Sequence, residues 1–178
     1  MNPRRLLSVL LLLALMPAGL SAARRDPLNE LEIEQLREAA QDPPKRLRLM
    51  LKFTRDRMAL VDAHRNSPAA GEDYGRRMHD LLEDFDTLAN ELEVNVETYA
   101  HRGVDVRKPL REILRSWNEF QEKLKSLKEA SEKEPRLAKA SGDYKFILED
   151  ALDAVSGGLE TTIEAINIQE LAHKNKKK

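Results

Sequence analysis

The sequence predicts an all-α protein: a bundle of about five helices built on a long antiparallel, coiled-coil-like hairpin. Three observations predict this class. The composition favours helix, since 34% of the 178 residues are charged, only 4% are aromatic and glycine is scarce. Helix-breaking residues fall in clusters, and the segments between them repeat apolar residues every three or four positions. Two of those segments also carry a continuous line of apolar residues, here called a seam, and the two seams match position by position when the chain folds back between them.

Residues 1–23 have the three parts of a cleavable signal peptide. A basic start at Arg4 and Arg5 precedes an apolar run over residues 6–16, and small residues follow at 21–23. That run spans only about 16 Å as a helix, half of a hydrocarbon core of roughly 30 Å, so a permanent anchor is not expected. The arginine pair leaves twin-arginine export open, although its neighbours match that signal poorly. We therefore expect an exported protein, either periplasmic or secreted.

The composition also excludes several functions. The chain has no cysteine, which rules out disulfides, thiol chemistry and covalently attached haem. Residues 24–172 are expected to form a single helical-bundle domain of acidic net charge, so nucleic-acid binding is not expected. Residues 173–178 are expected to be a basic disordered tail. For this tail we expect at most weak electrostatic contact with anionic envelope surfaces.

Prolines and glycines divide the domain into five predicted helices. They cover approximately residues 28–40, 43–65, 72–101, 106–134 and 143–172. Capping residues support these starts, because Asp42 stands before Pro43, while Asp105 and Asp143 stand before the fourth and fifth helices.

The predicted helices 72–101 and 106–134 each carry core-type residues at alternating steps of four and three. If the chain folds back at Gly103, every seam residue faces a partner at the same distance from the turn. The pairs are Tyr99–Val106, Asn95–Leu110, Leu92–Ile113, Leu88–Trp117, Phe85–Phe120, Leu81–Leu124, Met78–Leu127 and Tyr74–Ser131. Because further apolar positions flank both seams, we expect helices 43–65 and 143–172 to close a bundle around this hairpin.

Two features inside the predicted helices need a reason. Asn95 lies within a seam, where we expect it to fix the register or to reach water rather than to bind a ligand. Gly157 and Gly158 interrupt the last helix, and paired glycines cost about 1 kcal/mol each relative to alanine. A kink or a close helix crossing is expected there, and a hinge or a ligand approaching the backbone is the alternative.

The predicted helix 43–65 is basic and has a second apolar face, which makes it the candidate contact surface. The candidate residues are Leu49, Phe53, Leu60, Lys45, Arg46 and Lys52. Two interpretations stay open. The acidic helix 28–40 can cover this face and neutralise it within the chain, or the face can bind an external acidic partner or an anionic lipid surface.

Reactive constellations are not found in the sequence. The four histidines, His64, His79, His101 and His173, fall on different helices or helix ends, and only Glu170 to His173 has the Glu-x-x-His spacing of a di-iron bundle. No nucleophile elbow or glycine-rich phosphate loop is present. We therefore expect no catalytic residue and no metal site. An axial pair of a histidine with Met58 or Met78 stays open, although methionines at helical spacing usually fill the core.

These patterns favour an exported, non-catalytic helical-bundle protein that acts as a binding or scaffolding module in the cell envelope. Its partner would be an unknown protein or a second copy of itself. The alternative is a bundle that carries a small ligand, haem or metal between its helices.

Overall fold

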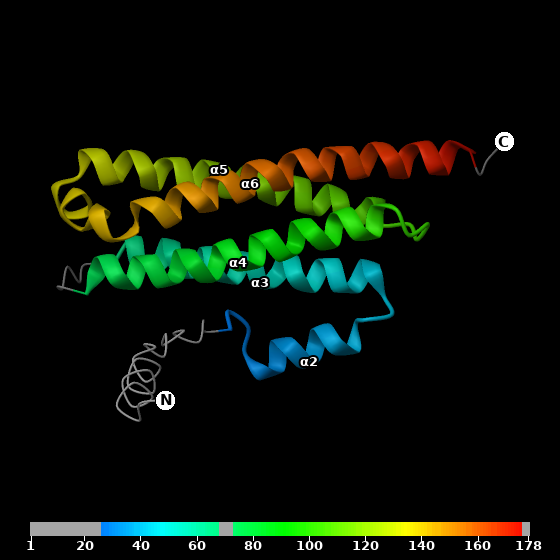
Figure 1. The fold of residues 1–178 in the computed structure, drawn as a ribbon, viewed down its shortest axis with the longest axis horizontal. Coiled ribbons are helices and arrows are strands. Elements are labelled where there is room, and N and C mark those ends of the chain that lie inside the picture. The colour runs from blue at the N-terminus through cyan, green and yellow to red at the C-terminus, as the bar shows by residue number, and fades with distance from the viewer. Residues whose placement is uncertain (1–25, 68–72, 176–178) are drawn as a thin grey trace, which may run out of the picture.

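The computed structural model describes residues 26–67 and 73–175, which contain five helices and no strand (Figure 1). The helices are α2 (Glu30–Glu38), α3 (Pro43–Arg65), α4 (Tyr74–Ala100), α5 (Arg107–Lys133) and α6 (Pro135–Asn175). The predicted all-α bundle is thus confirmed. The predicted signal peptide and residues 176–178 of the predicted tail lie outside the described residues.

Helices α3 to α6 lie side by side as a four-helix bundle, and α2 packs on the outside of α3 (Figure 1). The neighbouring pairs are α3 with α4, α4 with α6, α6 with α5, and α5 with α3. Helices α3 and α5 run in one direction, and α4 and α6 run in the other. Each of these two parallel pairs therefore forms one broad face of the bundle.

The predicted pairing of helices 72–101 and 106–134 as direct neighbours is not what the structure shows. Although α4 and α5 are consecutive and antiparallel, they lie diagonally across the bundle rather than side by side. Their largest side chains still meet in the centre, where the rings of Phe85 and Phe120 contact edge to face at 5.3 Å. A seam shows which residues point into the core, but it does not show which helix lies beside it, because diagonal helices share the same core.

The close helix crossing expected at the paired glycines is confirmed for one of them. Trp117, for which the sequence predicts Leu88 as the partner, packs against α6. A Cβ added to Gly158 would lie 2.6 Å from Cζ2 of the Trp117 ring. The indole Nε1 also donates a hydrogen bond to Oγ1 of Thr162 at 3.0 Å, so the only tryptophan is fully buried with its polar atom satisfied. At Gly157 the nearest neighbour is only the flexible carboxylate of Glu93.

Helix α6 begins earlier and ends later than predicted. It starts at Pro135 and passes through Gly142 and Asp143, so Asp143 is not an N-cap. Proline suits the first turn of a helix, and the preceding Glu134 is extended, as residues before proline prefer. At its other end α6 includes residues 173–175, which the sequence places in a disordered tail.

A buried glutamine holds the diagonal connection between α4 and α5. Gln169 on α6 donates from Nε2 to the carbonyl oxygen of Ala100 at 2.7 Å. Its Oε1 accepts a hydrogen bond from the backbone N–H of Val106 at 3.3 Å. One side chain thereby satisfies the end of α4 and the start of α5, which would otherwise leave polar backbone groups buried without partners.

Candidate functional site

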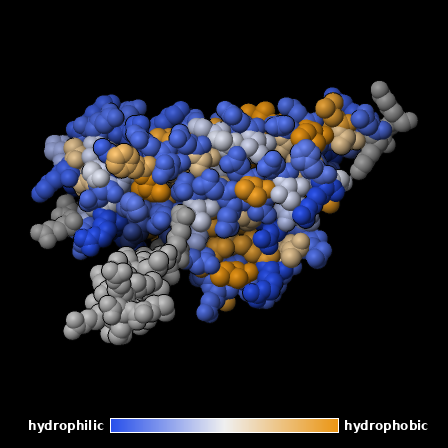
Figure 2. Space-filling view, in the orientation of Figure 1, coloured by the Kyte–Doolittle hydropathy of each residue, from blue (hydrophilic) through white to orange (hydrophobic). Residues whose placement is uncertain are grey.

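The predicted contact surface on the basic helix is covered only in part. Phe53 is only 1% exposed and Leu49 is half-buried against the core, whereas Leu60 is 48% exposed. Because α2 packs on α3 and buries Leu36 in the same core, Phe53 is not available as a free surface. Hydrophobic side chains do gather beside α2 (Figure 2), where Leu31 is 75% exposed.

Helix α2 is held by an ion pair with α3. The guanidinium of Arg57 contacts both carboxylate oxygens of Glu32, and both side chains are only 11% exposed. Arg57 also donates to the carbonyl of Pro27. Burial alone raises the pKa of Glu32, but hydrogen bonds from Arg57 and the backbone of Asn29 outweigh it, so that pKa lies below its ordinary value. This pair neutralises one carboxylate of α2 and one cation of α3 within the chain.

The other predicted basic residues have different surroundings. Arg46 is half-buried, donates to the carbonyl of Leu36 at 2.6 Å and lies 3.5 Å from Oδ1 of Asn95. Asn95 thus faces α3 and does not occupy a seam with α5. Lys52 is exposed and pairs with Asp56 at 2.7 Å, while Lys45 is exposed near the start of α3.

Charge is divided between the two broad faces of the bundle. Helix α3 carries seven Lys and Arg against two Asp and Glu, and α5 carries eight against five. Helix α4 carries two Lys and Arg against seven Asp and Glu, and α6 carries four against seven. Because α3 lies beside α5 and α4 beside α6, the two helices of one broad face carry a net positive charge and the two helices of the opposite face carry a net negative charge.

We define the basic patch as seven cationic residues on the N-terminal parts of α3 and α5; Arg46, which donates to α2, and Arg107, which pairs with Asp105, are not included. The seven residues are Lys45, Arg48, Lys52, Arg55, Lys108, Arg111 and Arg115. Arg48 pairs with Glu112 at 3.2 Å, and Arg111 pairs with Glu170 at 2.6 Å. Among the described residues, Arg55 is bound only by the neutral hydroxyl of Ser116, at 2.6 Å and 3.0 Å, so its charge is not balanced by that contact. The positive ends of two parallel helix dipoles add to the potential here.

A surface cavity of about 330 Å³ lies where α3 and α5 begin. Its lining residues are Pro44, Arg48, Asp105, Arg107, Lys108, Pro109 and Arg111. Asp105 accepts hydrogen bonds from the side chain and backbone of Arg107, which lower the pKa of its carboxyl group to about 2. The carboxylate therefore stays charged at neutral pH, and it accepts one backbone N–H at this helix terminus, that of Arg107, although the N-cap residue is Val106.

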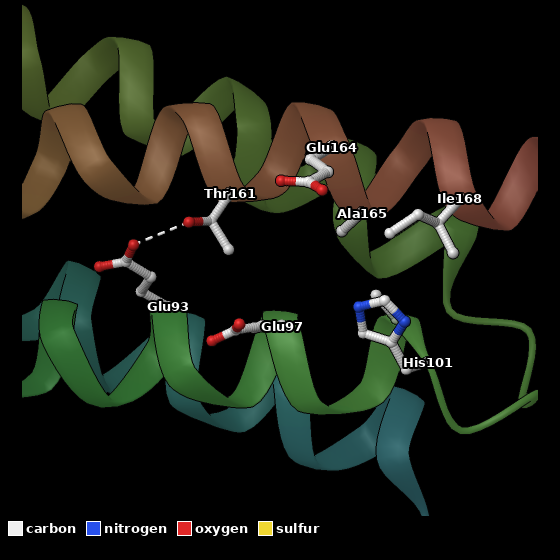
Figure 3. Close-up of a pocket in the computed structure, with 8 residues that line it drawn as sticks. Glu93, Glu97, His101, Thr161, Glu164, Ala165 and Ile168 are labelled. Carbon is white, nitrogen blue, oxygen red and sulfur yellow. Dashed lines mark hydrogen bonds between the residues drawn. The ribbon is translucent and has the colours of Figure 1, made fainter.

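We define the acidic groove as the cavity of about 320 Å³ between α4 and α6 (Figure 3). Its lining residues are Glu93, Glu97, Ala100, His101, Thr161, Glu164, Ala165 and Ile168. Oε1 of Glu93 accepts a hydrogen bond from the hydroxyl of Thr161 at 2.7 Å. The groove opens where small residues of α6, including Ala165, face α4. On the same face, Figure 2 shows mostly hydrophilic side chains with isolated hydrophobic ones.

The histidines do not come together. His64 stacks on Tyr74 at 4.4 Å and its Nε2 lies 3.0 Å from the carbonyl oxygen of Tyr74, while His101 lines the acidic groove. Within residues 26–67 and 73–175, no three His, Asp or Glu side chains are placed to hold a metal ion. Met58 and Met78 are buried in the hydrophobic core. In the same ranges, no helix is long and apolar enough to cross a membrane.

The basic residues on 43–65 are visible in the sequence, but the acidic groove was not predicted. Its acidic residues lie on two separate segments, and nothing in the sequence indicates that α4 and α6 are neighbours. The excess of acidic residues on each of these two helices is the sequence signal that points to the acidic groove. A comparison of the chain with family models, curated proteins and solved structures finds no match, so the function is argued from this geometry.

Proposed function

We propose that this protein is an exported, non-catalytic helical bundle that acts as a binding or scaffolding module in the cell envelope. The observation that carries the proposal is the division of charge between the basic α3/α5 face and the acidic α4/α6 face. Export is proposed from the signal-peptide pattern of residues 1–23.

The two faces suit binding of macromolecules more than chemistry on a small substrate. Each is built from helices of 23 residues or more, which are about 35 Å long or longer at a rise of about 1.5 Å per residue. Charged side chains spread over such a length act through complementary potentials, which increase association rates and select partners. Rigid helices also present those side chains with little ordering cost on binding.

Site-specific photo-crosslinking in the native envelope tests this proposal. A crosslinker is placed at Arg115 in the basic patch or at Glu164 in the acidic groove, and a control crosslinker replaces Gln35, an exposed neutral residue of α2. We expect defined adducts, with another protein or with a second copy, from the two charged faces and not from position 35. An absence of adducts from both faces would contradict the proposal.

Native mass spectrometry of the protein purified from the same envelope complements that experiment. Under the proposal, the protein retains a macromolecular partner and no small molecule. Visible absorbance or stoichiometric metal would favour instead the alternative, a bundle that carries a ligand between its helices.

A further inference from the structure

We propose that the acidic groove of one molecule binds the basic patch of a second copy of this chain. The inference rests on the proposed binding function and specifies its partner. It assigns a heterologous contact, in which two different surfaces of the same protein meet.

The fold leaves several charges on both surfaces without an ion pair among the described residues. In the groove, Glu97 and Glu164 are exposed and have no ion pair among the described residues, and Glu93 is bound only by the hydroxyl of Thr161. In the patch, Lys45, Lys108 and Arg115 are exposed and likewise have no ion pair in that part of the chain. Both surfaces therefore carry charge that is available to a partner.

The two surfaces also have positions that suit a contact between copies. Helices α3 and α5 begin at the end of the bundle where α4 ends, so the patch and the groove lie at the same end and on opposite faces (Figure 1). When the acidic groove of one molecule contacts the basic patch of the next, the resulting pair still has one unoccupied groove and one unoccupied patch. Because the two surfaces lie on opposite faces, such a contact does not close into a dimer but continues as a ring or an open array.

The presence of a basic and an acidic surface on one molecule favours a second copy over an anionic membrane or polymer as the partner. An anionic membrane or polymer would attract the basic patch but repel the acidic α4/α6 face, and it would leave the groove without a role. A second copy satisfies both surfaces at once. Without Arg4 and Arg5 of the predicted signal peptide, the formal net charge of -1 becomes only -3, so overall repulsion between copies of the mature chain is small.

Sedimentation velocity tests the inference on the full mature chain. We expect species larger than the monomer at about 20 mM salt and monomer at about 500 mM salt, because screening of exposed charges shortens from about 20 Å to about 4 Å over that range. Molecules that stay monomeric at low salt, at concentrations up to about 100 µM, overturn the inference.

Two charge-reversed variants make the test specific. The first carries Lys45→Glu, Lys108→Glu and Arg115→Glu, and the second carries Glu97→Lys and Glu164→Lys. Each variant alone is expected to bind itself at least tenfold more weakly than the unmodified chain. An equimolar mixture is expected to associate again, because the intact groove of the first variant meets the intact patch of the second.

The mixture also separates this contact from misfolding and from a symmetric contact. Misfolded variants would not recover association on mixing, and unchanged far-ultraviolet circular dichroism and melting temperature check the fold directly. If each surface instead contacts the same surface on the second copy, mixing the variants does not restore association, and that result overturns the inference. If the unmodified chain stays monomeric but binds anionic vesicles through the patch, the inference is also overturned. Crosslinks to other proteins from both faces of a monomeric chain would overturn it while leaving the proposed function intact.

Discussion

At Gly158, the indole ring of Trp117 lies directly on the backbone of α6. We expect Gly158→Ala to lower the free energy of unfolding by about 1–3 kcal/mol, because a Cβ placed 2.6 Å from a ring carbon forces the ring or the helix to move. The matched control is Gly142→Ala, where a Cβ meets nothing within 4 Å. At that position alanine is expected to stabilise the helix by about 0.5–1 kcal/mol.

Urea denaturation of both variants measures the difference. Equal stability of the two variants would show that the ring does not contact the backbone at Gly158.

Two buried tyrosine hydroxyl groups differ in their hydrogen bonding. The hydroxyl of Tyr144 lies 2.8 Å from that of Ser131, whereas the hydroxyl of Tyr74 is buried without a partner among the described residues. We expect Tyr144→Phe to cost about 1 kcal/mol of stability and Tyr74→Phe to be neutral or stabilising. Thermal unfolding by calorimetry compares the two variants, and a larger loss for Tyr74→Phe would refute this assignment.

The carboxyl group of Asp105 makes stability depend on pH in the acidic range. Hydrogen bonds from Arg107 lower its pKa to about 2 in the folded protein. A carboxyl group whose pKa is lower in the folded state stabilises the fold at pH values above its unfolded pKa. That contribution is lost as the pH falls through the folded value. We expect the loss between about pH 4 and pH 2, and a shallower decrease of stability for Asp105→Asn over the same range.

Denaturation series at several pH values measure this difference. Nuclear magnetic resonance titration provides a direct check, since Arg107→Gln is expected to move the pKa of Asp105 up towards its ordinary value. A titration of Asp105 near pH 4 in the unmodified chain would contradict the prediction.

At the scale of the elements, α2 is attached to α3 by one buried ion pair together with the buried side chain of Leu36. We expect Arg57→Met to release α2, because it leaves the carboxylate of Glu32 buried without its partner, a change that typically costs about 3–5 kcal/mol. Hydrogen exchange should then increase in residues 30–38 while α4 and α6 remain protected. The control is Arg37→Ala in an exposed pair with Glu34, where the effect should be below about 1 kcal/mol.

A double variant distinguishes the ion pair from general damage. Replacing Glu32 with leucine in the Arg57→Met chain removes the unpaired charge, so it should restore part of the protection of α2. Unchanged exchange in Arg57→Met would mean that apolar packing alone holds this helix.

Elements with strong local signals could be predicted from the sequence. The bounds of α3 agree with the prediction, because Asp42 caps the helix through the backbone N–H of Lys45 and proline occupies its first turn. The start of α6 could not be predicted, because Gly142 resembles a break. Burial of Leu137 favours continuing the helix through it. Tertiary packing, and not local preference, decides that boundary.

At the scale of the whole molecule, the seams predicted which residues face the core but not the order of the helices around it. The α3 part of the basic patch was predicted because it lies on one continuous segment, residues 43–65, whereas its α5 part, Lys108, Arg111 and Arg115, was not. The acidic groove joins Glu93 and Glu97 to Glu164 across two helices that are not consecutive. Their adjacency depends on the diagonal crossing of the chain, for which no short-range pattern exists.

Distance measurements test that diagonal arrangement. The chain lacks cysteine, so pairs of spin labels can be introduced without background at Asn90 on α4, Asn118 on α5 and Ser156 on α6. We expect the 90–118 distance to exceed the 90–156 distance by about 5 Å, since neighbouring helix axes lie about 8–10 Å apart and diagonal ones are farther apart. A shorter 90–118 distance would restore α4 and α5 as neighbours.

The hydrogen bonds of Gln169 have a consequence for the order of assembly. This residue follows Val106 by 63 positions and Ala100 by 69, yet it is the side chain that satisfies both of them. A ribosome makes the chain from its N-terminus, so the crossover is synthesised long before the group that fixes it. Until the C-terminal part of α6 docks, the first three helices of the bundle lack the side chain that fixes the position of α5. The final architecture is therefore completed by the last helix to be synthesised.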